Sequence, residues 1–147
     1  MRTRRFYLLV GLMALALAAC GGGPVRRISP PAVSIQQLSV AADGQWHVTL
    51  RIQNFSTVPT RFSAVKATLD IAGANAGTID VKPDIDIVED SADVVETTLR
   101  SATKLPATGD FAYRLKGTIE SSDPKGDYPI NYSSRLSPVP GIANTWR

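Results

Sequence analysis

Apolar and polar residues alternate along most of the chain. The clearest stretch covers residues 46–53, in which every second residue is apolar (WHVTLRIQ). A period of two places successive side chains on opposite faces of a strand, so this pattern predicts a strand with one buried and one wet face. The same reasoning predicts seven strands, over residues 33–40, 46–53, 65–71, 78–81, 94–99, 111–119 and 128–136.

Short turn signals separate these predicted strands. Asp43-Gly44 lies between the first two, and Asp-Gly is a strong signal for a hairpin turn. Residues 73–77 (GANAG) and 121–127 (SSDPKGD) have the composition of loops. We therefore predict an all-β fold: a single antiparallel β-sandwich of the immunoglobulin or fibronectin type III kind, with about seven strands and little helix.

The N-terminal residues follow a different pattern. Three arginines precede an uncharged, mainly apolar run over residues 6–19. A helix needs about 20 apolar residues to span a bilayer, so this run is too short for a comfortable transmembrane helix. A charged start, a short apolar run and small residues at its end are typical of a secretory signal peptide, which we predict over residues 1–19.

The four residues that end this segment, LAAC at positions 17–20, resemble the lipobox of bacterial lipoproteins. The resemblance implies that Cys20 is acylated and becomes the mature N-terminus. An ordinary signal peptide with a Cys nearby is the alternative. Gly21 stands where lipoproteins kept at the inner membrane of Gram-negative bacteria usually carry Asp. We therefore expect a protein of the bacterial cell envelope, at the outer membrane and facing the periplasm.

The rest of the chain divides into two parts. Residues 20–32 are rich in Gly and Pro, so we expect a lipid anchor and a flexible tether. Residues 33–147 hold all the predicted strands and a Pro-rich C-terminal tail. The tail, with Ser137, Pro138 and Trp146, has two interpretations: it packs across one end of the sandwich, or it is a pre-extended docking peptide.

Removing the signal segment changes the charge balance. The whole chain carries 16 Lys and Arg against 13 Asp and Glu, and three of the basic residues lie before residue 6. The side chains of the mature chain therefore sum to zero. Nucleic-acid-binding domains show a net or clustered positive charge, so we expect no nucleic acid among the partners. The expected partners are the membrane, reached through the anchor, and envelope proteins or lipid.

Residues 31–53, followed by Asn54, a polar Ser56-Thr57 and Pro59, resemble the late embryogenesis abundant type 2 family with its water-stress and hypersensitive-response (WHy) domain. Residues 64–73 and 113–119 fit later parts of the same pattern. One departure is Phe55, where the family often has Pro. The resemblance implies a fibronectin-like sandwich without catalytic residues and with a stress-protective role in drying or freezing. The alternative is a binding or adaptor subunit that uses an edge strand or the tail.

Carboxylates are concentrated in residues 80–96, where Lys82 is the only cation. Clustered carboxylates can hold calcium through their hard oxygen atoms, so Asp84, Asp86, Glu89 and Asp90 form a candidate calcium site. Asp84-Ile85-Asp86 begins like an EF-hand loop, but Glu89 stands where that loop needs Gly. The alternative is an acidic, solvated edge that discourages pairing between sheets.

Catalytic side chains are scarce. The chain has one Cys and one His, which excludes disulfide scaffolds and zinc sites built from several Cys and His residues. His47 falls on the polar side of its predicted strand, and no G-x-S-x-G nucleophile motif is present. We therefore predict a non-enzymatic protein with no cofactor.

Overall fold

The computed structural model describes residues 21–147, so the predicted signal segment and Cys20 lie outside it. The described residues form strands joined by turns and loops, and none of their segments is a helix long and apolar enough to cross a membrane. The strands are β1 (Ala32–Val40), β2 (Gln45–Gln53), β3 (Thr60–Ile71), β4 (Ala74–Val81), β5 (Ile85–Ile87), β6 (Ala92–Arg100), β7 (Phe111–Asp123), β8 (Lys125–Leu136) and β9 (Thr145–Trp146).

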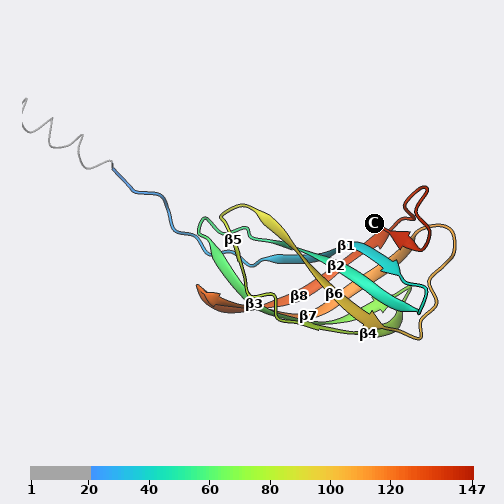
Figure 1. Ribbon diagram of the computed structural model, residues 1–147. Coiled ribbons are helices and arrows are strands. Elements are labelled where there is room, and N and C mark those ends of the chain that lie inside the picture. The colour runs from blue at the N-terminus through green and yellow to red at the C-terminus, as the bar shows by residue number, and fades with distance from the viewer. Residues whose placement is uncertain (1–20) are drawn as a thin grey trace, which may run out of the picture.

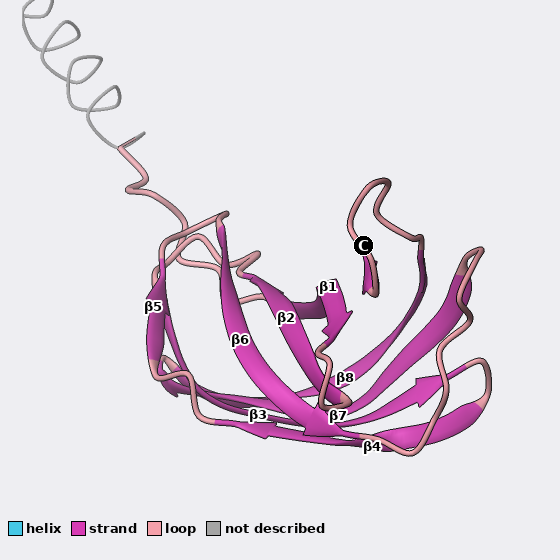
Figure 2. Cartoon of the chain, turned by 45° about the vertical axis from the view of Figure 1, so that its right-hand side comes forward, coloured by secondary structure: helices cyan, strands magenta, loops and turns pink. Residues whose placement is uncertain are grey.

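The strands form two packed antiparallel sheets (Figure 2). The first has the order β6-β2-β1-β9, and the second has the order β4-β3-β7-β8, with β5 paired to β3. Leaving aside the short strands β5 and β9, the chain places three strands in one sheet and four in the other, as in fibronectin type III domains. The predicted β-sandwich is confirmed.

The hydrophobic core lies between the two sheets and follows the alternation of the sequence. In β2, Trp46, Val48, Leu50 and Ile52 are all buried, and the residues between them are more exposed. Gly117 occupies an inward position of β7 because a Cβ atom there would collide with the backbone of Lys66 and Ala67 in β3. The core therefore needs glycine where this part of β7 pairs with β3.

Two short strands raise the number from about seven to nine. β5 adds three residues to the edge of the second sheet, and β9 adds two residues to the first. The predicted loop over residues 73–77 is wrong for most of its length, because β4 begins at Ala74. The turn consists of Ala72 and Gly73, with φ angles of 49° and 83°, as a tight two-residue hairpin turn requires. The predicted Asp43-Gly44 turn is confirmed, with Gly44 at φ 80°.

The tether and the C-terminus lie at opposite ends of the sandwich (Figure 1). The tether joins β1 at the end where β5 lies, and β9 pairs with Leu38 and Ser39 near the other end of β1. We call these the tether end and the far end.

Candidate functional site

The segment that follows the predicted lipidation site is fastened to the sandwich. Cys20 itself lies outside the described residues, but the backbone of Val25, Arg27 and Ser29 is held by the loop between β2 and β3. The Arg27 amide donates to Thr57 Oγ1 over 2.8 Å, and the Thr57 amide donates back to the Arg27 carbonyl over 3.0 Å. The Thr57 hydroxyl donates to the Val25 carbonyl over 2.8 Å. The second half of the expected flexible tether is thus bound to the domain.

Ser56 makes the next contact along the tether. Its Oγ atom accepts a hydrogen bond of 3.0 Å from the Ser29 amide, and the Ser56 side chain is buried. The Ser56 carbonyl also accepts a hydrogen bond of 3.2 Å from the Asp90 amide. One loop therefore binds both the tether and the loop between β5 and β6. We call residues 25–29, 54–58 and 87–91 together the tether junction.

Asn54 holds the tether junction from inside. It directly follows β2 and is only 1% exposed. Its Nδ2 atom donates to the carbonyls of Val58, Ile87 and Val88 at 3.0, 3.1 and 3.1 Å, and its Oδ1 atom accepts from the Ser56 amide at 2.9 Å. Buried polar groups are tolerated when they are paired in this way. A single amide thus fixes two loops that come from distant parts of the sequence.

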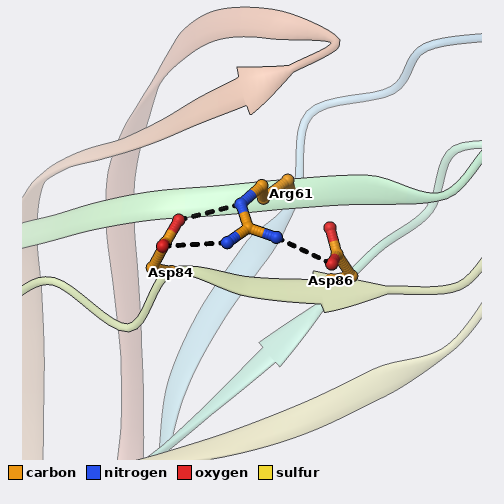
Figure 3. A network of polar contacts seen from close by, with 3 residues as sticks. All are labelled: Arg61, Asp84 and Asp86. Carbon is orange, nitrogen blue, oxygen red and sulfur yellow. Dashed lines mark hydrogen bonds and ion pairs between the residues drawn. The ribbon is translucent and has the colours of Figure 1, made fainter.

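The acidic segment forms ion pairs with an arginine of the same chain, Arg61. Arg61, in β3, donates from Nε to Asp84 Oδ1 at 2.9 Å and pairs from its second terminal nitrogen with Asp84 Oδ2 at 2.8 Å (Figure 3). The first terminal nitrogen of Arg61 lies 2.8 Å from Asp86 Oδ2. This hydrogen bonding to Arg61 is the main reason that the pKa of Asp84 is lowered from its ordinary value of 3.8.

The four residues of the candidate calcium site are not brought together. Asp84 and Asp86 share Arg61, while Glu89 and Asp90 lie in the turn before β6 and are exposed. Within residues 21–147, no three His, Cys, Asp or Glu side chains gather as metal ligands would. The calcium site therefore stays a prediction from the sequence, and in the structure the guanidinium of Arg61 pairs with two of its four carboxylates.

The remaining candidates lie apart from the tether junction. His47 is exposed on the outer face of the first sheet, in a shallow depression that Gln37, Glu96 and Thr98 also line. The C-terminal tail packs across the far end, as one of its two interpretations proposed. Trp146 is buried in β9, and the backbones of Ser137 and Arg147 exchange two hydrogen bonds.

Sequence reasoning noted Asn54, Ser56 and Thr57 as a strand end and a polar pair, without a structural role. It missed Arg61 altogether. The available signal was the run NFST at residues 54–57, directly after a strongly alternating strand. Asn, Ser and Thr at such a place typically form hydrogen bonds from their side chains to backbone groups of a loop. Nothing in that run indicates its partners, since Ile87 and Ser29 are 33 and 27 residues away.

Distant structural neighbours of this chain include the two described below. No family profile matches the chain, and no curated protein matches it. A solution structure described provisionally as a late embryogenesis abundant (LEA) protein is 20% identical, with 85% of this chain and 75% of that one covered and a TM-score of 0.44. A crystal structure of a protein from Archaeoglobus fulgidus is 14% identical, with 77% and 98% covered and a TM-score of 0.42. Both scores are low, and the assignment of the fold rests on the two sheets themselves.

Proposed function

We propose that this protein is a non-enzymatic lipoprotein of the bacterial envelope, held at the membrane by acylated Cys20. The observation that carries the proposal is the LAAC sequence at the end of an apolar run, preceded by arginines. The fastened tether supports it, because the segment that starts at the anchor is bound to one end of the sandwich by Ser56 and Thr57. Gly21 after the cysteine favours the outer membrane, facing the periplasm.

Replacement of the cysteine in a Gram-negative host tests the anchor. We expect Cys20→Ser to abolish acylation and to move the protein from the membrane fraction to the periplasmic fraction. Gly22→Ala is the matched control, since Gly22 lies on the tether with no atom near enough to crowd a new Cβ. Mass spectrometry of the N-terminal peptide measures acylation. A Cys20→Ser protein that stays membrane-bound would remove the lipoprotein proposal.

We further propose that the anchored sandwich protects other proteins or lipid during drying or freezing. The support is the resemblance of residues 31–53, 64–73 and 113–119 to the WHy pattern, together with a mature chain whose side-chain charges sum to zero. Residues 21–147 contain the whole described core, so they are the fragment to test. A labile enzyme is dried or frozen with this fragment at equal mass, beside an inert protein of similar size. Activity retained well above the inert control supports protection, and activity equal to it rejects protection.

A second candidate function is that of an adaptor that adds a partner strand at the edge of the second sheet. β8 is 12 residues long, lies at the end of the sheet order and pairs with β7 alone. The C-terminal tail is a weaker candidate for docking because Thr145 and Trp146 already pair with β1. A photo-crosslinker at Ser133, in β8, is expected to capture a stoichiometric envelope protein if this function holds. The same group at Thr78, on the opposite edge strand β4, is the control.

A further inference from the structure

Exposed apolar side chains are concentrated at the tether junction. Seven large hydrophobic residues of residues 21–147 are markedly exposed, and four of them belong to the junction: Val25 at 81%, Ile28 at 48%, Phe55 at 47% and Val88 at 57%. Scattered single apolar residues are normal on a protein surface, but a cluster marks an interaction site. The concentration at one end of the sandwich therefore needs a partner.

Hydrogen bonds hold the segments that carry these side chains next to one another. The Val88 carbonyl is bound to Asn54, the residue before Phe55. The Val25 carbonyl is bound to Thr57, two residues after Phe55. Three of the four exposed apolar side chains, those of Val25, Phe55 and Val88, thus lie on segments whose backbones are held together before any partner binds.

The charges around these side chains are mixed. Arg26 and Arg27 are exposed on the tether, and Glu89 and Asp90 are exposed directly after Val88. A surface with charges of one sign would favour a partner with the opposite charge. This surface carries both positive and negative side chains, so it favours a partner that carries both charges. A zwitterionic phospholipid headgroup carries a phosphate for the guanidinium groups and an ammonium for the carboxylates.

The length of the tether brings this end to the bilayer. Val25 is five positions after Cys20, and a fully extended chain spans at most about 3.5 Å per residue, or about 17 Å over this distance. β7, which runs along the sandwich, has 13 residues and therefore a length of about 43 Å. A domain much longer than its free tether must keep its tether end near the membrane.

We propose that the tether junction docks on the surface of a zwitterionic phospholipid bilayer, with Phe55 and Val88 entering the interface between headgroups and acyl chains. The sandwich then stands on its tether end, with the far end directed away from the bilayer. This inference rests on the proposed anchor at Cys20.

The test separates docking from natural acylation. Cys20 is the only cysteine of the chain, so residues 20–147 can be coupled through its thiol to a maleimide lipid in phosphatidylcholine vesicles. Amide hydrogen exchange is compared between the coupled and the free protein. We expect exchange to slow at least threefold in residues 54–58 and 87–91 and to stay unchanged in residues 101–110 at the far end. Unchanged exchange at the junction would overturn the docking proposal even if the host acylates Cys20.

Matched variants identify the side chains that dock. Phe55→Ser with Val88→Ser is expected to remove the slowing, while Ile142→Ser, at an equally exposed apolar side chain of the far end, is expected to leave it intact. Urea denaturation checks that each variant is folded. Slowing that survives the double substitution overturns the assignment of these side chains. If exchange slows only when anionic lipid is added to the vesicles, the proposal of a zwitterionic partner is wrong, and attraction between the arginines and the anionic lipid explains the binding.

Discussion

At the tether end, a buried amide has every hydrogen-bonding group paired, whereas at the far end a buried indole has none. Asn54 donates to three carbonyls and accepts from one amide. Trp146 is 5% exposed, and its Nε1 atom is the only buried side-chain nitrogen or oxygen of residues 21–147 without a partner. Trp146 packs edge-on against Phe111, with ring centroids 5.8 Å apart and planes at 65°.

The difference shows two ways of closing a sandwich. Hydrogen bonds have directions, so the polar network of Asn54 specifies where each loop of the tether junction must lie. At the far end the backbone is held by its own hydrogen bonds, such as the two between Ser137 and Arg147, and the buried side chain of Trp146 adds packing without a hydrogen bond. The end that we propose to meet the membrane is the one where a buried polar side chain fixes the loops.

The largest expected effect comes from Asn54→Ala. The change removes the Asn54 partner of the Ile87 and Val88 carbonyls and of the Ser56 amide, while the Val58 carbonyl keeps the Thr60 hydroxyl as a donor, and each buried unpaired group costs about 1–3 kcal/mol. Because water can reach part of the loops, we expect a loss of about 4 kcal/mol in the free energy of unfolding. Urea denaturation measures it.

Asn131→Ala is the control for that change. Asn131 is exposed and accepts hydrogen bonds only from the Arg114 side chain, so its replacement should alter stability by less than about 0.5 kcal/mol. A similar loss for the two variants would mean that Asn54 does not organise the tether end.

The next effect in size is that of Trp146→Ala at the far end. Replacement of a buried tryptophan removes a large packed surface and typically costs about 3–5 kcal/mol. We expect about 3 kcal/mol, because a site next to the C-terminus can relax into the space that the ring leaves. Hydrogen exchange should rise in β9 and in residues 137–144 and stay unchanged in residues 54–58. A rise at both ends would show that the two ends are coupled.

Trp146→Phe sharpens the comparison. The ring that packs on Phe111 is kept, and the unpaired Nε1 atom is removed. The two changes oppose each other, so we expect stability to stay within about 1 kcal/mol of that of the unchanged protein. Thermal unfolding checks this value. A loss close to that of Trp146→Ala would contradict the view that the indole nitrogen contributes nothing.

The alternation of the sequence was enough to predict the central strands, while the ends of the sandwich depended on contacts it does not encode. β2 follows its period-two pattern along its whole length. β3 begins five residues earlier than predicted because its register shifts on either side of Phe62 interrupt the period. The candidate site was less predictable still. Asn54 acts on carbonyls 33 and 34 residues away, and the acidic segment was read without Arg61, which lies 23 residues before Asp84.

The smallest expected effect concerns the ion pair beside the tether junction. Arg61 lowers the pKa of Asp84, chiefly through a hydrogen bond. The unfolded carboxyl therefore takes up its proton at a higher pH than the folded one, so the pair stabilises the fold above pH 3.8 and ceases to do so as the pH falls through the lowered folded value. Exposed ion pairs contribute little, and the Asp84 side chain is 64% exposed.

Asp84→Asn tests this ion pair without disturbing the backbone, because Asn tolerates the positive φ of 49° at this position. We expect the urea midpoint of the unchanged protein to lie slightly above that of the variant near neutral pH. The two midpoints should converge as the pH falls through the lowered folded value, below which the carboxyl is protonated in both states. A difference that stays constant with pH would show that Asp84 contributes through its backbone turn and not through its charge. The tether end would then be held, like the far end, by contacts that pH does not alter.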